Sequence, residues 1–194
     1  MDKLQECAKA FKELTDIQYH IIIGRKGHAI DLIIDFSPMD FHHLMGLGKL
    51  KDLRLATQNR ESVFSNIIDG NISDSTITRS RYHSQIQNRF APLAAIEQIF
   101  DDNRLVFRYN KQQNSFSLIE ADYLLSTPHE GNEIYIFLAR HGNSETFFCR
   151  SFFPKESRDY TVGQPVYTLL FKEKIKLSSG AREVQYNKLT LLQK

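Results

Sequence analysis

The spacing of hydrophobic residues changes near residue 102, from mainly helical to alternating. Leu4, Cys7, Phe11 and Leu14 predict an amphipathic helix over residues 2–15. The same spacing predicts a helix over 60–69, closed by Gly70, and helical segments over 78–90 and 93–100 with a turn or kink at the intervening proline. The polar stretch 71–78 predicts a loop between them.

Alternating residues predict the strands. Two β-rich runs, 19–23 and 29–36, are joined by a glycine-containing connection and predict an early hairpin. Five further strands are expected over 105–109, 116–124, 133–139, 146–153 and 166–172, with turns at 111–114 and 141–143. Because short connections join antiparallel neighbours, we expect an α+β fold: an antiparallel β-sheet meander with helices packed on one face.

The chain has 194 residues, enough to bury one sizeable core, and no segment resembles a linker. We expect residues 1–194 to form a single domain: an N-terminal helix in 1–18, a core over 19–174, and a C-terminal tail or extra strand in 175–194. The net charge is only +2, so any phosphate binding requires a local basic patch. The start is no secretory signal and no apolar run approaches about 18 residues, which predicts a cytoplasmic protein without membrane contact.

One stretch departs from ordinary core sequence: Phe41-His42-His43-Leu44-Met45-Gly46-Leu47-Gly48-Lys49-Leu50. It places titratable side chains and glycines among apolar residues, and each costs free energy inside a helix. Ser37 and Pro38 predict a helix that begins near Pro38. If that helix continues, His42 and Lys49 lie nearly on one line; if the glycines end it, the alignment is lost. The plain alternative to a site is a helix end with surface histidines.

The sequence contains no recognisable metal or phosphate-loop motif. Adjacent histidines on a helix diverge by about 100°, which is poor geometry for binding one ion. The two cysteines, Cys7 and Cys149, lie far apart in the chain and resemble small core residues. Gly24-Arg25-Lys26-Gly27 lacks phosphate-loop spacing and predicts a tight turn. We therefore expect no metal and no cofactor.

Metal-free chemistry at a phosphate needs proton transfer and nearby positive charge. Candidates are His42 or His43 for proton transfer, Lys49, Arg89 and Arg150 for charge, and Ser151, Tyr160 and Thr161 as hydrogen-bond donors. Such a set suits attack of an RNA 2′-hydroxyl on the adjacent phosphate. Taken singly, each has an ordinary alternative, since arginines are common surface residues and a tyrosine can close the edge of a core.

Four segments together carry a resemblance: Tyr19–Lys26, Phe41–Asp52, Ser151–Pro154 and Asp159–Thr161. They resemble the phage barnase–EndoU–colicin–RelE-like nucleases, specifically the fourth group so named, over roughly residues 19–174. The F-H-H-L-x-G-L-x-K-L run is the specific part. The resemblance implies a barnase/EndoU/colicin/RelE-like fold and a metal-independent endoribonuclease of phages or other bacterial mobile elements, acting as a toxin or effector on RNA.

The resemblance also implies roles for individual residues. Its H-L-x-G-L core favours His43 over His42 as the group that transfers a proton. The resulting hypothesis is a catalytic set of His43, Lys49, Arg150, Ser151 and Tyr160, with His42, Arg89 and Thr161 binding substrate. The expected partners are RNA, with tRNA as one candidate, and a cognate inhibitor protein. No glutamate can be assigned as a base. Two alternatives remain: a non-catalytic RNA- or protein-binding module, and a structural component of a mobile element.

Overall fold

The computed structural model of the protein describes residues 2–189 except 115, 141 and 143. Within them the α-helices are α1 (Lys3–Leu14), α2 (Pro38–Leu44), α3 (Arg60–Ile68), α4 (Asp74–Ile77), α5 (Phe90–Ala94) and α6 (Ile96–Asp102). The strands are β1 (Ile17–Arg25), β2 (His28–Ile34), β3 (Leu105–Arg108), β4 (Tyr123–His129), β5 (Asn132–Arg140), β6 (Thr146–Pro154), β7 (Val166–Lys176) and β8 (Ala181–Asn187). Short 3₁₀ turns are η1 (Leu47–Lys49), η2 (Arg54–Ala56), η3 (His83–Gln85), η4 (Gln87–Arg89) and η5 (Lys111–Asn114).

The strands close on themselves, which the sequence-based expectation missed. Their order is β1-β2-β6-β5-β4-β3-β7, and β7 pairs back along β1 from Ile17↔Lys176 to Gly24↔Thr168. β2 and β6 run parallel, and β8 pairs with β7 outside this ring. The expected antiparallel meander with helices on one face is therefore wrong: the fold is a closed, mixed barrel of seven strands with an eighth attached. The alternation of apolar and polar residues predicts which side chains of a strand are buried, but it does not predict which distant strand pairs with it.

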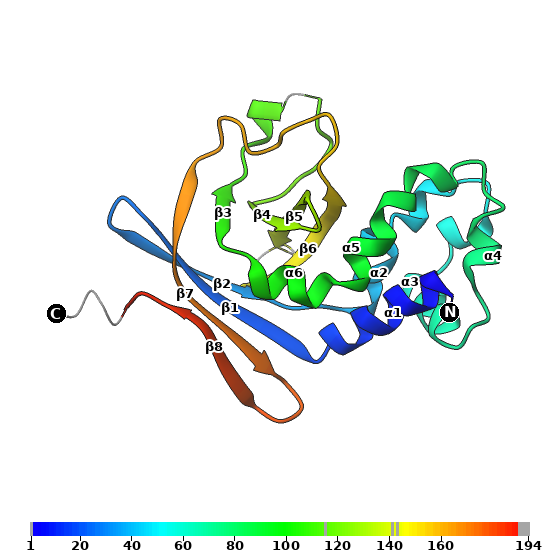
Figure 1. The fold of residues 1–194 in the computed structure, drawn as a ribbon, viewed down its shortest axis with the longest axis horizontal. Coiled ribbons are helices and arrows are strands. Elements are labelled where there is room, and N and C mark those ends of the chain that lie inside the picture. The colour runs from blue at the N-terminus through cyan, green and yellow to red at the C-terminus, as the bar shows by residue number, and fades with distance from the viewer. Residues whose placement is uncertain (1, 115, 141, 143, 190–194) are drawn as a thin grey trace.

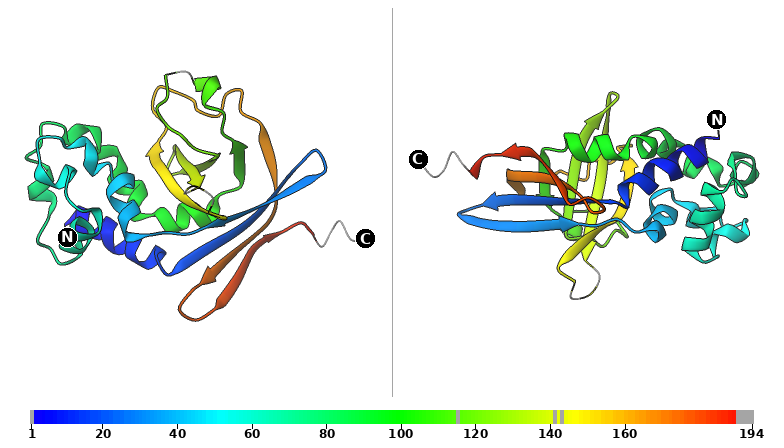
Figure 2. Two further views of the ribbon diagram at one scale, coloured as in Figure 1. Left: turned by 180° about the vertical axis from the view of Figure 1, so that it is seen from behind. Right: turned by 90° about the horizontal axis from the view of Figure 1, so that it is seen from below.

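Helices α1 to α5 gather on one side of the strands (Figures 1 and 2). The apolar stripe of α1 is fully buried, and the Phe11 ring lies 5.8–6.3 Å from the rings of Phe36, Phe41 and Phe64. These rings join α1, the end of β2, α2 and α3 in the same core. The packing fixes α2, which carries the two histidines, against the barrel. No helix in the described part of the chain is both long and apolar enough to span a membrane.

Most predicted helices and strands are present, but the helix expected over 78–90 is wrong. The chain there forms turns and the short η3 and η4. Ser80 donates its hydroxyl to Asp52 at 2.5 Å, and the Arg81 backbone N–H donates to the same carboxylate at 2.9 Å. These tertiary hydrogen bonds compete with helical ones, so the apolar spacing of the segment did not lead to a continuous helix. The stretch 71–78, expected as a loop, contains α4.

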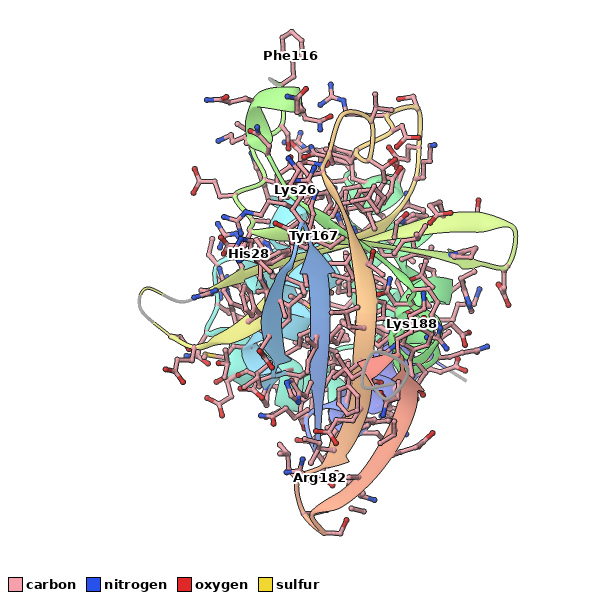
Figure 3. The ribbon with its side chains drawn as sticks, turned by 90° about the vertical axis from the view of Figure 1, so that its left-hand side faces the viewer. Lys26, His28, Phe116, Tyr167, Arg182 and Lys188 are labelled. Atoms are coloured by element: carbon pink, nitrogen blue, oxygen red, sulfur yellow. The ribbon has the colours of Figure 1, made fainter. Side chains whose placement is uncertain are left out.

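The strand expected over 116–124 is also wrong, because β4 begins only at Tyr123. Before it lies a loop with Phe116 85% exposed, at one end of the molecule, far from Arg182 at the other (Figure 3). The β4–β5 turn is made by Glu130 and Gly131, whose φ angles are 47° and 77°. Of the turn predicted at 141–143, residues 141 and 143 lie outside the described residues. At the C-terminal end, the chain forms the strand β8.

Candidate active site

Helix α2 begins and ends where local sequence requires. Ser37 forms a capping box with Asp40, and Pro38 occupies the first turn. The helix stops at Leu44, and Gly46 follows with φ 79°, a left-handed conformation that costs glycine little. The chain then turns into η1. The glycines therefore end the helix, and the straight alignment of His42 with Lys49 is lost.

Gly46 also permits close packing. A Cβ atom at this position would lie 3.0 Å from Ile86 Cγ2 and 3.3 Å from Arg89 Nε. The Arg89 side chain passes beside the glycine, and its Nη1 donates to the Leu44 carbonyl at 2.7 Å. Gly46 thus lets a buried arginine reach the end of α2.

This packing predicts a stability difference between two glycine variants. Gly46→Ala and Gly131→Ala impose the same left-handed strain, since their φ angles are 79° and 77°, worth about 1–2 kcal/mol each. Only the Cβ at position 46 meets other atoms, because nothing lies within 4 Å of one at position 131. Gly46→Ala should lose a further ~1–3 kcal/mol through overpacking. Urea unfolding of both variants measures this, and equal losses would mean that the close approach of Arg89 is unimportant.

Strand β6 contains a β-bulge at Arg150. Opposite it on β5, Phe137 pairs with Ser151 while the next residue, Leu138, pairs with Cys149, so Arg150 is the extra residue. Before the bulge the buried residues are Phe147 and Cys149, two positions apart. After it the next buried residue is Phe152, three positions further on. Bulges redirect the following side chains. Here the bulge places Ser151 and Phe153 together on the side of the strand that carries the site.

Two adjoining pockets lie where α2, η1 and η4 meet β6. The histidine pocket, of about 350 Å³, includes His42, His43 and Arg60 in its wall. The aromatic pocket, of about 300 Å³, includes Ile119, Phe153 and Tyr160. Three residues line both pockets: Lys49, Arg89 and Ser151. Segments more than 100 residues apart in the sequence therefore surround one region.

The two histidines have different surroundings. His42 is 4% exposed, and its Nε2 hydrogen-bonds to the Leu55 carbonyl at 3.0 Å, which ties α2 to η2. Burial lowers the pKa of His42. His43 has solvent access at the pocket mouth, yet desolvation of its ring and the positive charges of Arg150 and Arg60 lower its pKa as well. His43 is therefore the accessible histidine, and the neutral imidazole is favoured there.

Arg89 is the unusual group of the site. Its side chain is 6% exposed, and its Nε has no hydrogen-bond partner. Among the described residues, no carboxylate forms an ion pair with Arg89. Burial lowers the pKa of Arg89 to about 10, and burial together with Arg89 lowers the pKa of Lys49. The region shared by the pockets thus holds excess positive charge suited to an anion.

The remaining predicted residues lie nearby but outside both pockets. Arg150 is exposed on the bulge and acts on His43 through its charge. Thr161 donates its N–H and Oγ1 to Asp159 at 2.9 and 2.6 Å, so its polar atoms are already engaged. The described residues contain no group of three or more His, Cys, Asp or Glu side chains arranged to hold a metal ion.

Among the pocket-lining residues that sequence reasoning missed are Arg60, Phe153 and Glu156. Glu156 is the carboxylate of the aromatic pocket, and it accepts a hydrogen bond from Asn88 Nδ2 at 2.7 Å. One sequence signal was available. The apolar spacing of three from Cys149 to Phe152 interrupts strand alternation, which marks a bulge and puts Phe153 on the same side as Ser151.

Comparison with known proteins agrees with the resemblance read from the sequence. The family model described as phage-Barnase-EndoU-ColicinE5/D-RelE like nuclease4 matches residues 3–189. The chain therefore belongs to this family of phage-associated nucleases. No curated protein matches it, and no solved structure does.

Proposed function

We propose that the protein is a metal-independent endoribonuclease of a phage or mobile element, acting as a toxin or effector on RNA. The observation that carries the proposal is the buried Arg89 between two pockets, beside Lys49 and His43, with its Nε left without a hydrogen-bond partner. Glu156 acts on Arg89 through its charge but forms no ion pair with it. A buried charge without a contacting counter-ion costs several kcal/mol, so a site that keeps one is suited to an opposite charge. A phosphate diester supplies that charge and can accept both hydrogen bonds of a guanidinium edge.

The proposed reaction divides the work among these side chains. Neutral His43 removes the proton of the 2′-hydroxyl, whose oxygen attacks the adjacent phosphorus while the bond to the 5′ oxygen breaks. Lys49 and Arg89 stabilise the negative charge of the transition state. Lys49, with its lowered pKa, donates a proton to the leaving 5′ oxygen. The products are a 2′,3′-cyclic phosphate and a 5′-hydroxyl.

In this scheme the other predicted residues position the substrate or tune the base. Ser151 and Tyr160 line the aromatic pocket and are proposed as hydrogen-bond donors to the sugar-phosphate. Arg150 keeps the pKa of His43 low and so favours its basic form. His42 supports the wall of the histidine pocket rather than the chemistry, since Leu55 occupies its Nε2.

The test is cleavage of RNA in the presence of EDTA. We expect new ends that carry a 2′,3′-cyclic phosphate and a 5′-hydroxyl, and resistance of a matched oligonucleotide methylated on the 2′-oxygen at the cut nucleotide. Cleavage of DNA of the same sequence, or cleavage that requires added Mg²⁺, would contradict the mechanism. Binding of RNA without any cleavage would favour the alternative, a non-catalytic binding module.

A further inference from the structure

The aromatic pocket has two chemically different walls. Lys49 and Arg89 form a cationic wall, whereas Ile119, Phe153 and Tyr160 form an apolar one. Glu156, hydrogen-bonded to Asn88, also lines the pocket. A nucleotide has the same division, with a charged phosphate joined to a flat base. No Phe, Tyr or Trp is found among the described residues that line the histidine pocket. The two sides of the shared cationic region therefore differ.

The apolar wall is part of a second hydrophobic cluster that extends across β3, β4, β5 and β6. Phe153 stacks on Phe137 with ring centres 5.6 Å apart and planes 22° apart. Tyr160 meets the same Phe137 ring edge to face, with centres 5.4 Å apart. The guanidinium carbon of Arg89 lies 5.8 Å from the centre of the Phe153 ring, so the aromatic and cationic walls adjoin.

The carboxylate of Asp159 helps to hold the loop that carries Tyr160. Asp159 accepts hydrogen bonds from the Tyr135 hydroxyl at 3.1 Å and from Thr161, and pairs with Lys155 at 2.5 Å. These partners hold the pKa of Asp159 well below its usual range. The ring of Tyr160 is therefore positioned before any ligand binds, which reduces the entropy cost of binding.

We propose that the aromatic pocket is a nucleobase subsite, in which the base of one nucleotide beside the bound phosphate stacks on the ring of Phe153. The Tyr160 ring, at 71° to that of Phe153, meets the base at its edge. The position of the phosphate rests on the proposed function. Bases within a double helix have both faces covered, so a subsite that uses a base face selects unpaired RNA, in a single strand or a loop. The rings of the histidine pocket are the imidazoles of His42, which is hydrogen-bonded to Leu55, and of His43, which the proposed function uses as the base, so base stacking is expected on one side of the phosphate only.

Dinucleotides test this asymmetry directly. Their single phosphate can occupy the cationic region in only one way, so each base is assigned to one side of it. The wild-type protein is titrated with a dinucleotide whose 2′-oxygens are methylated, and with versions lacking the 5′ base, the 3′ base or both. Loss of one base should weaken binding about 10- to 100-fold, as expected for one stacking contact, whereas loss of the other should change it little. Equal effects of the two bases, no effect of either, or no binding of any dinucleotide would overturn the proposal.

A variant identifies the rings as the cause. Phe153→Leu keeps an apolar side chain on β6 but removes the ring, so it should bind the intact dinucleotide as weakly as the wild type binds the ligand without the sensitive base. The ligand lacking that base should bind both proteins equally. Phe171→Leu is the matched control, because Phe171 is a half-buried residue on β7 that lines neither pocket. A similar loss for both ligands in Phe153→Leu would overturn the stacking role.

The titrations also separate this subsite from the proposed activity. A protein that cleaves RNA but shows no difference between the 5′ and 3′ bases keeps its function and refutes the subsite. A protein that cleaves nothing but binds dinucleotides asymmetrically supports the subsite and refutes the nuclease mechanism. The wild-type titrations need no substitution, so they decide the question even if Phe153→Leu does not fold.

Discussion

Replacing His43 with alanine should lower the rate of RNA cleavage by about 10²–10⁴-fold, the usual loss when a general base is removed. The melting temperature should change little. His43 has solvent access at the end of α2, and its ring is not part of the hydrophobic core. Single-turnover rates with excess protein and thermal unfolding of the same preparation measure the two effects.

Two further histidine variants serve as controls for the effects of His43→Ala on cleavage rate and on stability. His28→Ala changes an exposed residue at the start of β2 that lines neither pocket, and it should leave both quantities unchanged. His42→Ala should mainly lower stability, because His42 is buried and bonded to Leu55. If His43→Ala instead unfolds easily yet retains its activity per folded molecule, His43 serves packing and the mechanism is wrong.

The elements that could be predicted from the sequence are those determined by local contacts. The α1 stripe, the β1–β2 hairpin and the capped start of α2 depend on residues a few positions apart. The closure of the barrel does not, since β1 pairs with β7 about 150 positions later and β2 pairs with β6 in parallel. The helix predicted over 78–90 is wrong for a related reason, because Asp52, from another part of the chain, accepts hydrogen bonds from Ser80 and Arg81.

The candidate site divides in the same way. The segment around His43 could be recognised because glycines and titratable residues interrupt an apolar run. Arg89 resembles any surface arginine in the sequence, and only the fold reveals that its charge is buried beside Gly46. Phe153 and Glu156 join the site because a bulge and a loop place them there. Recognition of a site from sequence thus depends on residues that break local rules, whereas its full membership depends on tertiary packing.

A second buried cation concerns stability rather than chemistry. Lys172 on β7 is 0% exposed, and its ammonium donates to the main-chain carbonyls of Phe100 and Asp101 at the end of α6. It also lies 5.6 Å from the centre of the Tyr19 ring. Desolvation lowers the pKa of Lys172 to about 7, from 10.5 for a free lysine. In the folded protein this residue therefore releases its proton far more easily than in the unfolded chain.

The sign of the resulting pH dependence follows from proton binding. Below pH 7 Lys172 is protonated in both states, and its contribution to the free energy of unfolding does not change with pH. Between pH 7 and 10.5 the unfolded state binds more protons, so stability from this group rises with pH, by up to ~1.4 kcal/mol per unit. Wild type should therefore gain about 2–3 kcal/mol relative to Lys172→Met between pH 7 and pH 9.

Urea unfolding of both proteins across this range makes the measurement. The variant is the necessary reference because other buried groups also titrate: burial raises the pKa of Cys7 to about 12, which lowers stability as the pH rises past 9. That contribution is common to both proteins and cancels in the difference. Parallel stability curves would mean that Lys172 keeps its proton in the folded state. Its hydrogen bonds to the carbonyls at the end of α6 would then outweigh the cost of desolvating the ammonium.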